Sequence, residues 1–218
     1  MRKTLIALTA AGTLGAATAT AAYADHHGQD QSQTAMDTSA IQSGSYSTDP
    51  AHTLVEWRLS HFGFNDYFGL FGDAEGTLQL DTETLSNSSV DITLPITSLA
   101  VVSEGLRDHM LRPGADGGEP DFFGPDPDDA RFVSTSVEQT GPTTANITGD
   151  LTLNGQTAPV TIAAELSGTG ENPMNEKATI GFHGTTTIMR SQWGLDYGVP
   201  MGLGDEVMLD ITVAFEKN

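Results

Sequence analysis

The side chains best suited to chemistry in this 218-residue chain are four histidines: His52, His61, His109 and His183. Three of them would suffice for a zinc site, but no pair has the H-x-H or H-x-x-x-H spacing that presents two ligands together on a strand or helix. The chain has no cysteine, so a thiolate metal site and a cysteine nucleophile are both excluded. A G-x-S-x-G elbow for serine hydrolysis is also missing. The sequence therefore predicts no metal, no catalytic residue and a non-enzymatic function.

One charged group, Arg107-Asp108-His109, falls in the single segment that reads as a helix, which Ser103 can cap. Two interpretations stay open for it. Arg107 and Asp108 could reach the head group of a ligand or organise the mouth of its site, or they could form an ion pair that ties the helix to the rest of the fold. An enzyme acting on a lipid or quinone would instead need His61, Asp108 and His109 to converge with perturbed pKa values.

The elements that position these residues are strands. From Tyr46 onward short alternating segments are separated by Gly, Asn, Asp and Pro, which is typical of an all-β sandwich or barrel. Apolar side chains occupy every second position in residues 55–59, 90–94 and 207–215. Asn154-Gly155 suits the type I′ turn of a hairpin between two such strands. We expect about eight or more antiparallel strands and one short crossover helix, with the sheet closed or stacked to protect its edges.

The start of the chain is an export signal by composition. Arg2 and Lys3 precede a short apolar stretch, and the small residues around Ala24 suit cleavage before Asp25. We expect a signal peptide over residues 1–24, a flexible polar leader over residues 25–45 and one domain over residues 46–218. This predicts a periplasmic or secreted protein, and no later segment is long enough to span a membrane.

The charge of the chain excludes several partners. It carries 29 acidic and 9 basic side chains, for a net charge of -20. Such a surface repels phosphate backbones and anionic lipid headgroups, so nucleic-acid binding and polybasic membrane docking are both excluded. The remaining partner class is a hydrophobic small molecule, because a barrel of about eight strands is either filled by side chains or wide enough for one small ligand.

An ordered set of motifs carries a family resemblance. The set begins with Tyr46-x-x-Asp49-x-x-His52, Val55-x-Trp57, His61-Phe62-Gly63 and Gly69-x-Phe71, and continues with Arg107-Asp108-His109-x-Leu111, Asp121-Phe122-Phe123, Ala130-Arg131-Phe132-x-Ser134-Thr135, Gly149-x-Leu151-Thr152-Leu153-x-Gly155, Pro159-Val160 and Arg190-Ser191-x-Trp193-Gly194-Leu195. It resembles the YceI-like, polyisoprenoid-binding family of exported bacterial proteins over nearly all of residues 46–216. One departure is the insertion at residues 113–120, which lengthens the loop after the helix.

The resemblance implies an extended, lipocalin-like antiparallel β-barrel whose tunnel holds a polyisoprenoid, an isoprenoid quinone or a fatty-acid-like lipid. No other cofactor is expected. Candidate ligand-binding residues combine this implication with the inward positions of the strands: Trp57, Leu59, Phe62, Phe64, Phe71, Ile92, Leu94, Leu106, Arg107, Asp108, Met110, Phe122, Phe123, Phe132, Ile180, Phe182 and Trp193. A structural role for Arg190, stacked on Trp193, is a further expectation.

The function that we expect is non-catalytic binding, sequestration or transport of a long apolar lipid in the periplasm. Two alternatives remain: an enzyme acting on a lipid or quinone, and a stress-response protein whose barrel is solid. The sequence leaves open which lipid is bound, whether it is carried, stored or sensed, and whether two barrels pair as a homodimer.

Overall fold

Antiparallel strands and one helix make up the fold. The structure is a computed structural model that describes residues 38–218, so the predicted signal peptide and residues 25–37 of the predicted leader lie outside the described residues. The elements are β1 (Gly44–Thr48), β2 (Leu54–His61), β3 (Asn65–Phe71), β4 (Glu75–Leu80), β5 (Ser89–Leu94), α1 (Glu104–Leu111), β6 (Ala130–Gln139), β7 (Thr144–Leu153), β8 (Gln156–Glu171), β9 (Ala178–Met189) and β10 (Glu206–Lys217). Strand β1 takes in Gly44 and Ser45, which the sequence placed in the leader.

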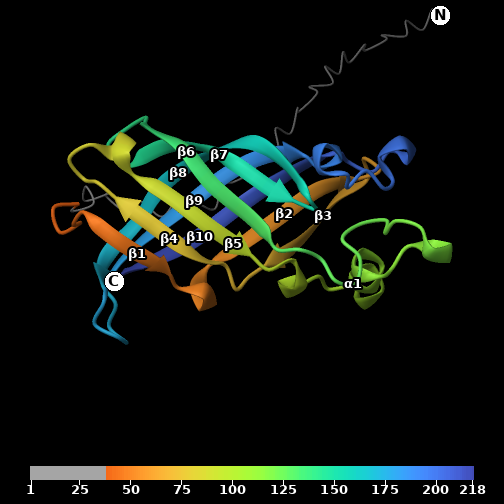
Figure 1. The fold of residues 1–218 in the computed structure, drawn as a ribbon, viewed down its shortest axis with the longest axis horizontal. Helices are drawn as coiled ribbons and strands as arrows, with labels where there is room; N and C mark the ends of the chain where they lie inside the picture. Colours follow the sequence, from red (N-terminus) through yellow and green to blue (C-terminus); the bar gives the residue numbers. More distant parts are fainter. Residues whose placement is uncertain (1–37) are drawn as a thin grey trace, which may run out of the picture. The chain divides into compact units, whose positions relative to one another are not determined.

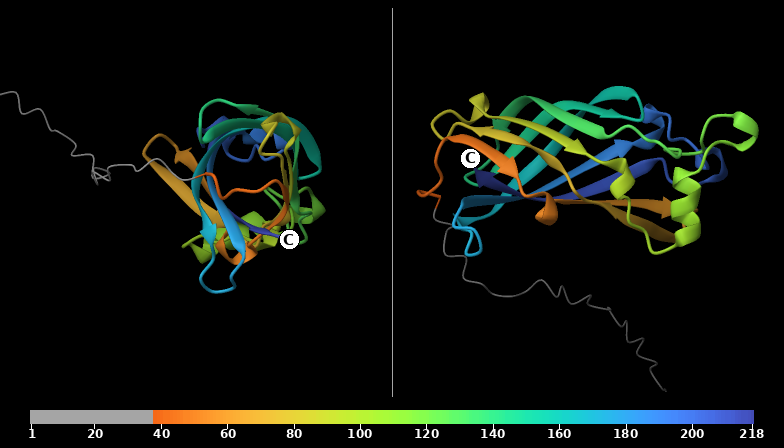
Figure 2. Two further views of the ribbon diagram at one scale, coloured as in Figure 1. Left: turned by 90° about the vertical axis from the view of Figure 1, so that its left-hand side faces the viewer. Right: turned by 60° about the horizontal axis from the view of Figure 1, so that its bottom comes forward.

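The sheet closes into an eight-strand ring in the order β1, β4, β5, β6, β7, β8, β9 and β10, with β10 pairing back to β1. All of these pairings are antiparallel, and Figure 2 shows the ring end-on. One edge of β10 is shared: residues 215–217 pair with β1, and residues 208–212 pair with β2. The β2–β3 hairpin therefore continues the wall past the end of β1. The predicted lipocalin-like β-barrel with one helix is confirmed.

The turn between β7 and β8 forms as the sequence predicts. Asn154 and Gly155 have φ values of 49° and 70°, the left-handed conformation that both central residues of a type I′ turn require. The Asn154 side chain also donates a hydrogen bond to the carbonyl oxygen of Trp193, 2.9 Å away. The turn is thereby attached to the 3₁₀ turn Arg190–Trp193, which follows β9.

Helix α1 lies at one end of the barrel (Figure 1). The hydroxyl of Ser103 accepts a hydrogen bond from the amide of Leu106, as predicted for the N-cap. At the other end of the helix, the carbonyl of Met110 accepts from the amides of Phe123 and Gly124. These bonds bring the residues that follow the insertion back against the helix, although the insertion itself makes a separate 3₁₀ turn, Ala115–Gly117.

The core is divided along the barrel. One buried cluster lies near α1 and includes Trp57, Met110 and Trp193, whereas a second includes Tyr46 and Phe215. A side chain packs closely on the wall at Gly149, where a Cβ atom would lie 2.6 Å from the ring of Phe132. A glycine there leaves room for that ring inside the barrel.

None of the helices in the described residues is long and apolar enough to cross a membrane.

Candidate functional site

The inner face of β10 shows that the middle of the barrel is hollow. Its inward side chains are those at odd positions, as the alternation predicts. Val207 and Phe215, near the two ends of the strand, are buried, but Leu209 and Ile211 between them are only half-buried although they face inward. An inward residue keeps accessible surface only where it adjoins empty space. The interior therefore contains empty space beside the middle of β10.

Three adjoining cavities follow the barrel axis. The helix-end cavity, of about 130 Å³, lies beside Met110 of α1. The middle cavity, of about 190 Å³, shares five lining residues with it: Val55, Leu94, Ala130, Leu151 and Leu209. The loop-end cavity, of about 360 Å³, reaches the β4–β5 and β6–β7 connections and shares five others with the middle cavity: Leu78, Val90, Ile147, Ala164 and Phe182.

The three cavities differ in chemistry. Apolar side chains and alkyl groups dominate the wall of the middle cavity. In the wall of the helix-end cavity, Trp57 and Arg190 are the only described residues whose side chains contain nitrogen or oxygen. The loop-end cavity instead has a polar rim with Thr82, Glu83 and Gln139. Together their volumes fall in the range of ~300–1,000 Å³ that is typical of ligand sites. The arrangement suits a narrow, elongated apolar molecule.

Most of the candidate lining residues are where the sequence placed them. Those in the walls of the cavities are Trp57, Leu59, Phe71, Ile92, Leu94, Met110, Phe122, Phe123, Phe132, Ile180 and Phe182. They come from β2, β3, β5, β6, β9, α1 and the loop after α1. Period two placed the strand residues correctly because the pleat sends alternate side chains to opposite faces of a sheet.

Four predicted apolar residues lie outside the cavity walls. Phe62 and Phe64 are in the turn between β2 and β3, where the strand alternation has ended, and Phe64 is 87 % exposed. Trp193 is buried in the 3₁₀ turn after β9, and its Nε1 donates to the carbonyl of Leu151, 3.1 Å away. Leu106 packs against the core cluster near α1 without reaching a cavity.

The charged residues of α1 do not enter the interior either. Arg107 and Asp108 are exposed, and the Arg107 Nε donates to the carbonyl of Leu99. The ion pairs of this region centre instead on Asp121, which accepts from Arg112 at 3.0 Å and lies 2.7 Å from the His109 ring. Hydrogen bonds from His109 and then Arg112 hold the pKa of Asp121 below its ordinary value. The ion pairs that tie this end are therefore those of Asp121 and not one between Arg107 and Asp108, and contact of these two residues with a ligand head group stays a prediction.

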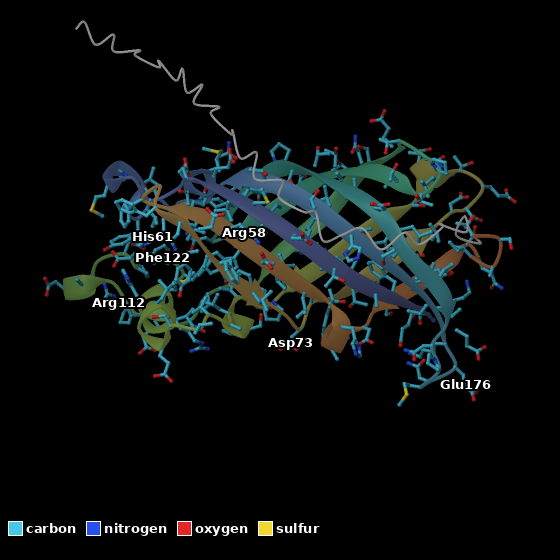
Figure 3. All side chains as sticks on the ribbon, turned by 180° about the vertical axis from the view of Figure 1, so that it is seen from behind. Arg58, His61, Asp73, Arg112, Phe122 and Glu176 are labelled. Atoms are coloured by element: carbon cyan, nitrogen blue, oxygen red, sulfur yellow. The ribbon has the colours of Figure 1, made fainter. Side chains whose placement is uncertain are left out.

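His109 also takes part in an aromatic group. Its ring meets those of Phe122 and Tyr197 edge-on, with centroids 5.3 and 5.0 Å away. Figure 3 shows Phe122 and Arg112 at the same end of the barrel, with Glu176 at the opposite end. An enzyme would have to bring His61, Asp108 and His109 together. The ring of His61 instead contacts Phe62 and Tyr67, and Asp108 is exposed, so the three side chains have different surroundings.

Among the described residues, Arg190 is the one charged side chain in the wall of the helix-end cavity, and it is 4 % exposed. Its guanidinium donates to the carbonyls of Gly204, Leu195 and Tyr197, which arranges the loop between β9 and β10. Burial lowers its pKa, and the more distant Asp205 and Asp196 oppose that shift. The expected stacking on Trp193 is thus replaced by three backbone contacts.

Several lining residues were not among the candidates. Leu78, Ile147, Val160, Ile162, Val213 and Phe215 are examples. All are apolar strand residues, and for Val213 and Phe215 the alternation along β10 already contained the signal. No group of three or more metal-ligating side chains occurs within residues 38–218.

Known proteins share both the sequence pattern and the fold. The pattern of YceI-like domains matches residues 46–215. A UPF0312 protein of Pseudomonas putida is 35 % identical over 162 residues, which cover 74 % of this chain and 80 % of that protein. Among solved structures, Burkholderia cenocepacia BcnA has a TM-score of 0.60 at 19 % identity, with 77 % of this chain and 98 % of that chain covered. A polyisoprenoid binding domain from Saccharophagus degradans has a TM-score of 0.55 at 12 % identity, with 79 % and 98 % covered. The chain belongs to the YceI-like domain family.

Proposed function

We propose that this protein binds one long-chain apolar lipid inside its barrel, without catalysis, and sequesters or carries it in the periplasm. The observation that carries the proposal is the hollow middle of the barrel, where Leu209 and Ile211 point inward and remain half-buried. Burying a hydrocarbon chain there removes its surface from water at about 25 cal/mol per Å². The name of the related domain from Saccharophagus degradans, a polyisoprenoid binding domain, supports the same class of ligand.

Polyisoprenoids, isoprenoid quinones and fatty-acid-like chains all fit this description. A wall of methyl and methylene groups distinguishes such tails weakly, because one methylene changes binding by only ~1–3 kcal/mol. The width and length of the bore would then discriminate among lipids more strongly than contacts to the branches of their tails do. Export of the chain, which would place it in the periplasm, is supported by the composition of residues 1–24.

Ala164 offers a direct test. It faces inward on β8 and lines both the middle and the loop-end cavities, whereas its neighbour Ala163 is exposed. Ala164→Phe places a ring across the path of the guest. We expect it to weaken binding of cis-parinaric acid, a fluorescent polyene fatty acid, by about tenfold or more, because the ring occupies the space that the chain needs.

Ala163→Phe is the matched control, since it adds the same ring to the outer face of the same strand. It should leave the dissociation constant within about twofold of wild type. Circular dichroism and thermal unfolding of both variants report whether the barrel still forms. If folded Ala164→Phe protein binds the probe as tightly as wild type, the guest does not occupy the bore and the proposal fails.

A further inference from the structure

The mouth of the loop-end cavity leaves apolar side chains open to water. This cavity has a volume of about 360 Å³, and Leu80, Leu85 and Val90 in its wall are only half-buried. Its rim residues Thr82 and Glu83 are exposed, so the cavity reaches the surface of the barrel. Apolar surface in this position favours a further apolar group that covers it.

The opposite end of the bore is already covered. Met110 of α1, together with Phe122 and Phe123 from the loop after it, lines the helix-end cavity. The carbonyl of Met110 accepts from the amides of Phe123 and Gly124, which holds that loop against the helix. Among the described residues, none in the wall of this cavity is exposed. The loop end is therefore the more open end of the bore.

The first described residues of the chain form part of the open mouth. Thr38 and Ile41 both line the loop-end cavity, and the amide of Ile41 donates to the carbonyl of Thr38 at 3.1 Å. Ser43 then attaches the segment to the barrel. Its hydroxyl accepts from the amide of Thr82, and its carbonyl accepts from Nζ of Lys217, each at 2.9 Å. The residues that precede Thr38 therefore continue from the rim of the loop-end cavity.

Met36 is the apolar side chain that these preceding residues bring to the mouth. Residues 25–37, DHHGQDQSQTAMD, contain no other sizeable apolar side chain. Two residues of chain span at most ~7 Å, so the Cα atom of Met36 cannot lie farther than that from the Cα atom of Thr38, which lines the cavity. A methionine also suits an irregular apolar opening, because its unbranched side chain adapts to the space available.

We propose that the side chain of Met36 enters the mouth of the loop-end cavity and closes it when no guest is bound. Burial of one side chain offsets only part of the entropy that is lost when its segment becomes ordered, so the closure is reversible. A lipid that enters the bore from this end displaces Met36, and this second step rests on the proposed function.

Methyl NMR tests the closed state without a guest. The exported protein is labelled with ¹³C at the methyl groups of Met, Leu and Val, and is stripped of lipid. We expect nuclear Overhauser contacts between the methyl group of Met36 and those of Leu80 and Val90. Met174 is the matched control, because it is 89 % exposed in the β8–β9 connection and does not line the cavity. It should make no such contacts.

The displacement step is tested with cis-parinaric acid. Saturation with this probe should remove the methyl contacts of Met36. Met36→Gln replaces the thioether by a polar side chain of similar length, which leaves the mouth open. We expect this variant to lower the dissociation constant of the probe about threefold, because closed molecules no longer compete with binding. Met174→Gln should leave the dissociation constant within about 1.5-fold of wild type.

The possible results separate the two steps. If the methyl group of Met36 makes no contact with the cavity wall in lipid-free protein, the inference is wrong, whatever the probe does. If its contacts persist at saturation and Met36→Gln binds the probe as wild type does, Met36 does not close the path of the guest and the displacement step is wrong. If the probe binds to none of these proteins, the proposed function fails, while the methyl contacts still decide whether Met36 docks.

Discussion

Two charged side chains are buried in the described part of the chain, and each organises a different connection between strands. Arg190 collects three carbonyls of the β9–β10 connection. Glu216, on β10, accepts hydrogen bonds from Asn172, Asn175 and Lys177 in the β8–β9 connection. The sequence does not reveal either role. The partners of Arg190 are backbone atoms, and those of Glu216 are about 40 residues away in the chain. Such roles become visible only in the fold.

Glu216 predicts a pH dependence of stability. The hydrogen bond from Lys177, followed by that from Asn175, holds the pKa of Glu216 below its ordinary value. A carboxyl group with a lowered folded pKa stabilises the fold fully above its unfolded pKa of about 4.3, and this stabilisation is lost as the pH falls through the folded value. Glu216→Gln should therefore lower the free energy of unfolding by about 1 kcal/mol at pH 7, and the difference should shrink below about pH 4.

Urea unfolding of both proteins across this pH range measures the effect. Glu206→Gln is the control, because Glu206 is exposed on the same strand and should change stability by less than about 0.5 kcal/mol at any pH. An equal difference between Glu216→Gln and wild type at neutral and acid pH would show that the carboxylate charge plays no part.

At the scale of elements, local sequence determines the turn of the β7–β8 hairpin, whereas contacts between residues far apart in the chain determine the position of the loop after α1. Asn154-Gly155 adopts its turn because those two residue types tolerate positive φ. By contrast, the loop after α1 returns to the barrel through backbone hydrogen bonds to Met110 and through the ion pairs of Asp121, whose partners the sequence motif does not identify. Alternation likewise predicted the wall residues of the strands and failed at Phe64, which lies beyond the end of β2.

Gly155→Ala tests the turn on its own. No atom lies within 4 Å of a Cβ built at Gly155, so the substitution changes backbone preference without creating a clash. Because φ is positive there, we expect the variant to lose about 1 kcal/mol of stability by urea unfolding. Gly170→Ala is the control, since its surroundings are equally open and its φ is not in the positive range; it should be neutral or slightly stabilising. Equal losses in both variants would contradict the strain argument.

At the scale of the whole molecule, the barrel combines an acidic exterior with an apolar interior. The net charge of -20 predicts repulsion of anionic polymers, while the three cavities are lined mainly by apolar side chains. The alternation and the family resemblance were sufficient to predict the closed barrel and much of its lining. They could not show how much of the interior is empty, because period two gives the direction of a side chain and not the space in front of it.

The most direct test of a lipid inside the barrel is to purify the protein from its own source, denature it in organic solvent and analyse the organic phase by mass spectrometry. Ala164→Phe protein, purified in parallel from the same source, corrects for lipid that adheres to the surface. We predict an elongated, largely hydrocarbon lipid, recovered at about one molecule per wild-type barrel and strongly depleted from the variant. Recovery of no such lipid from wild type, or of equal amounts from both proteins, would contradict the account.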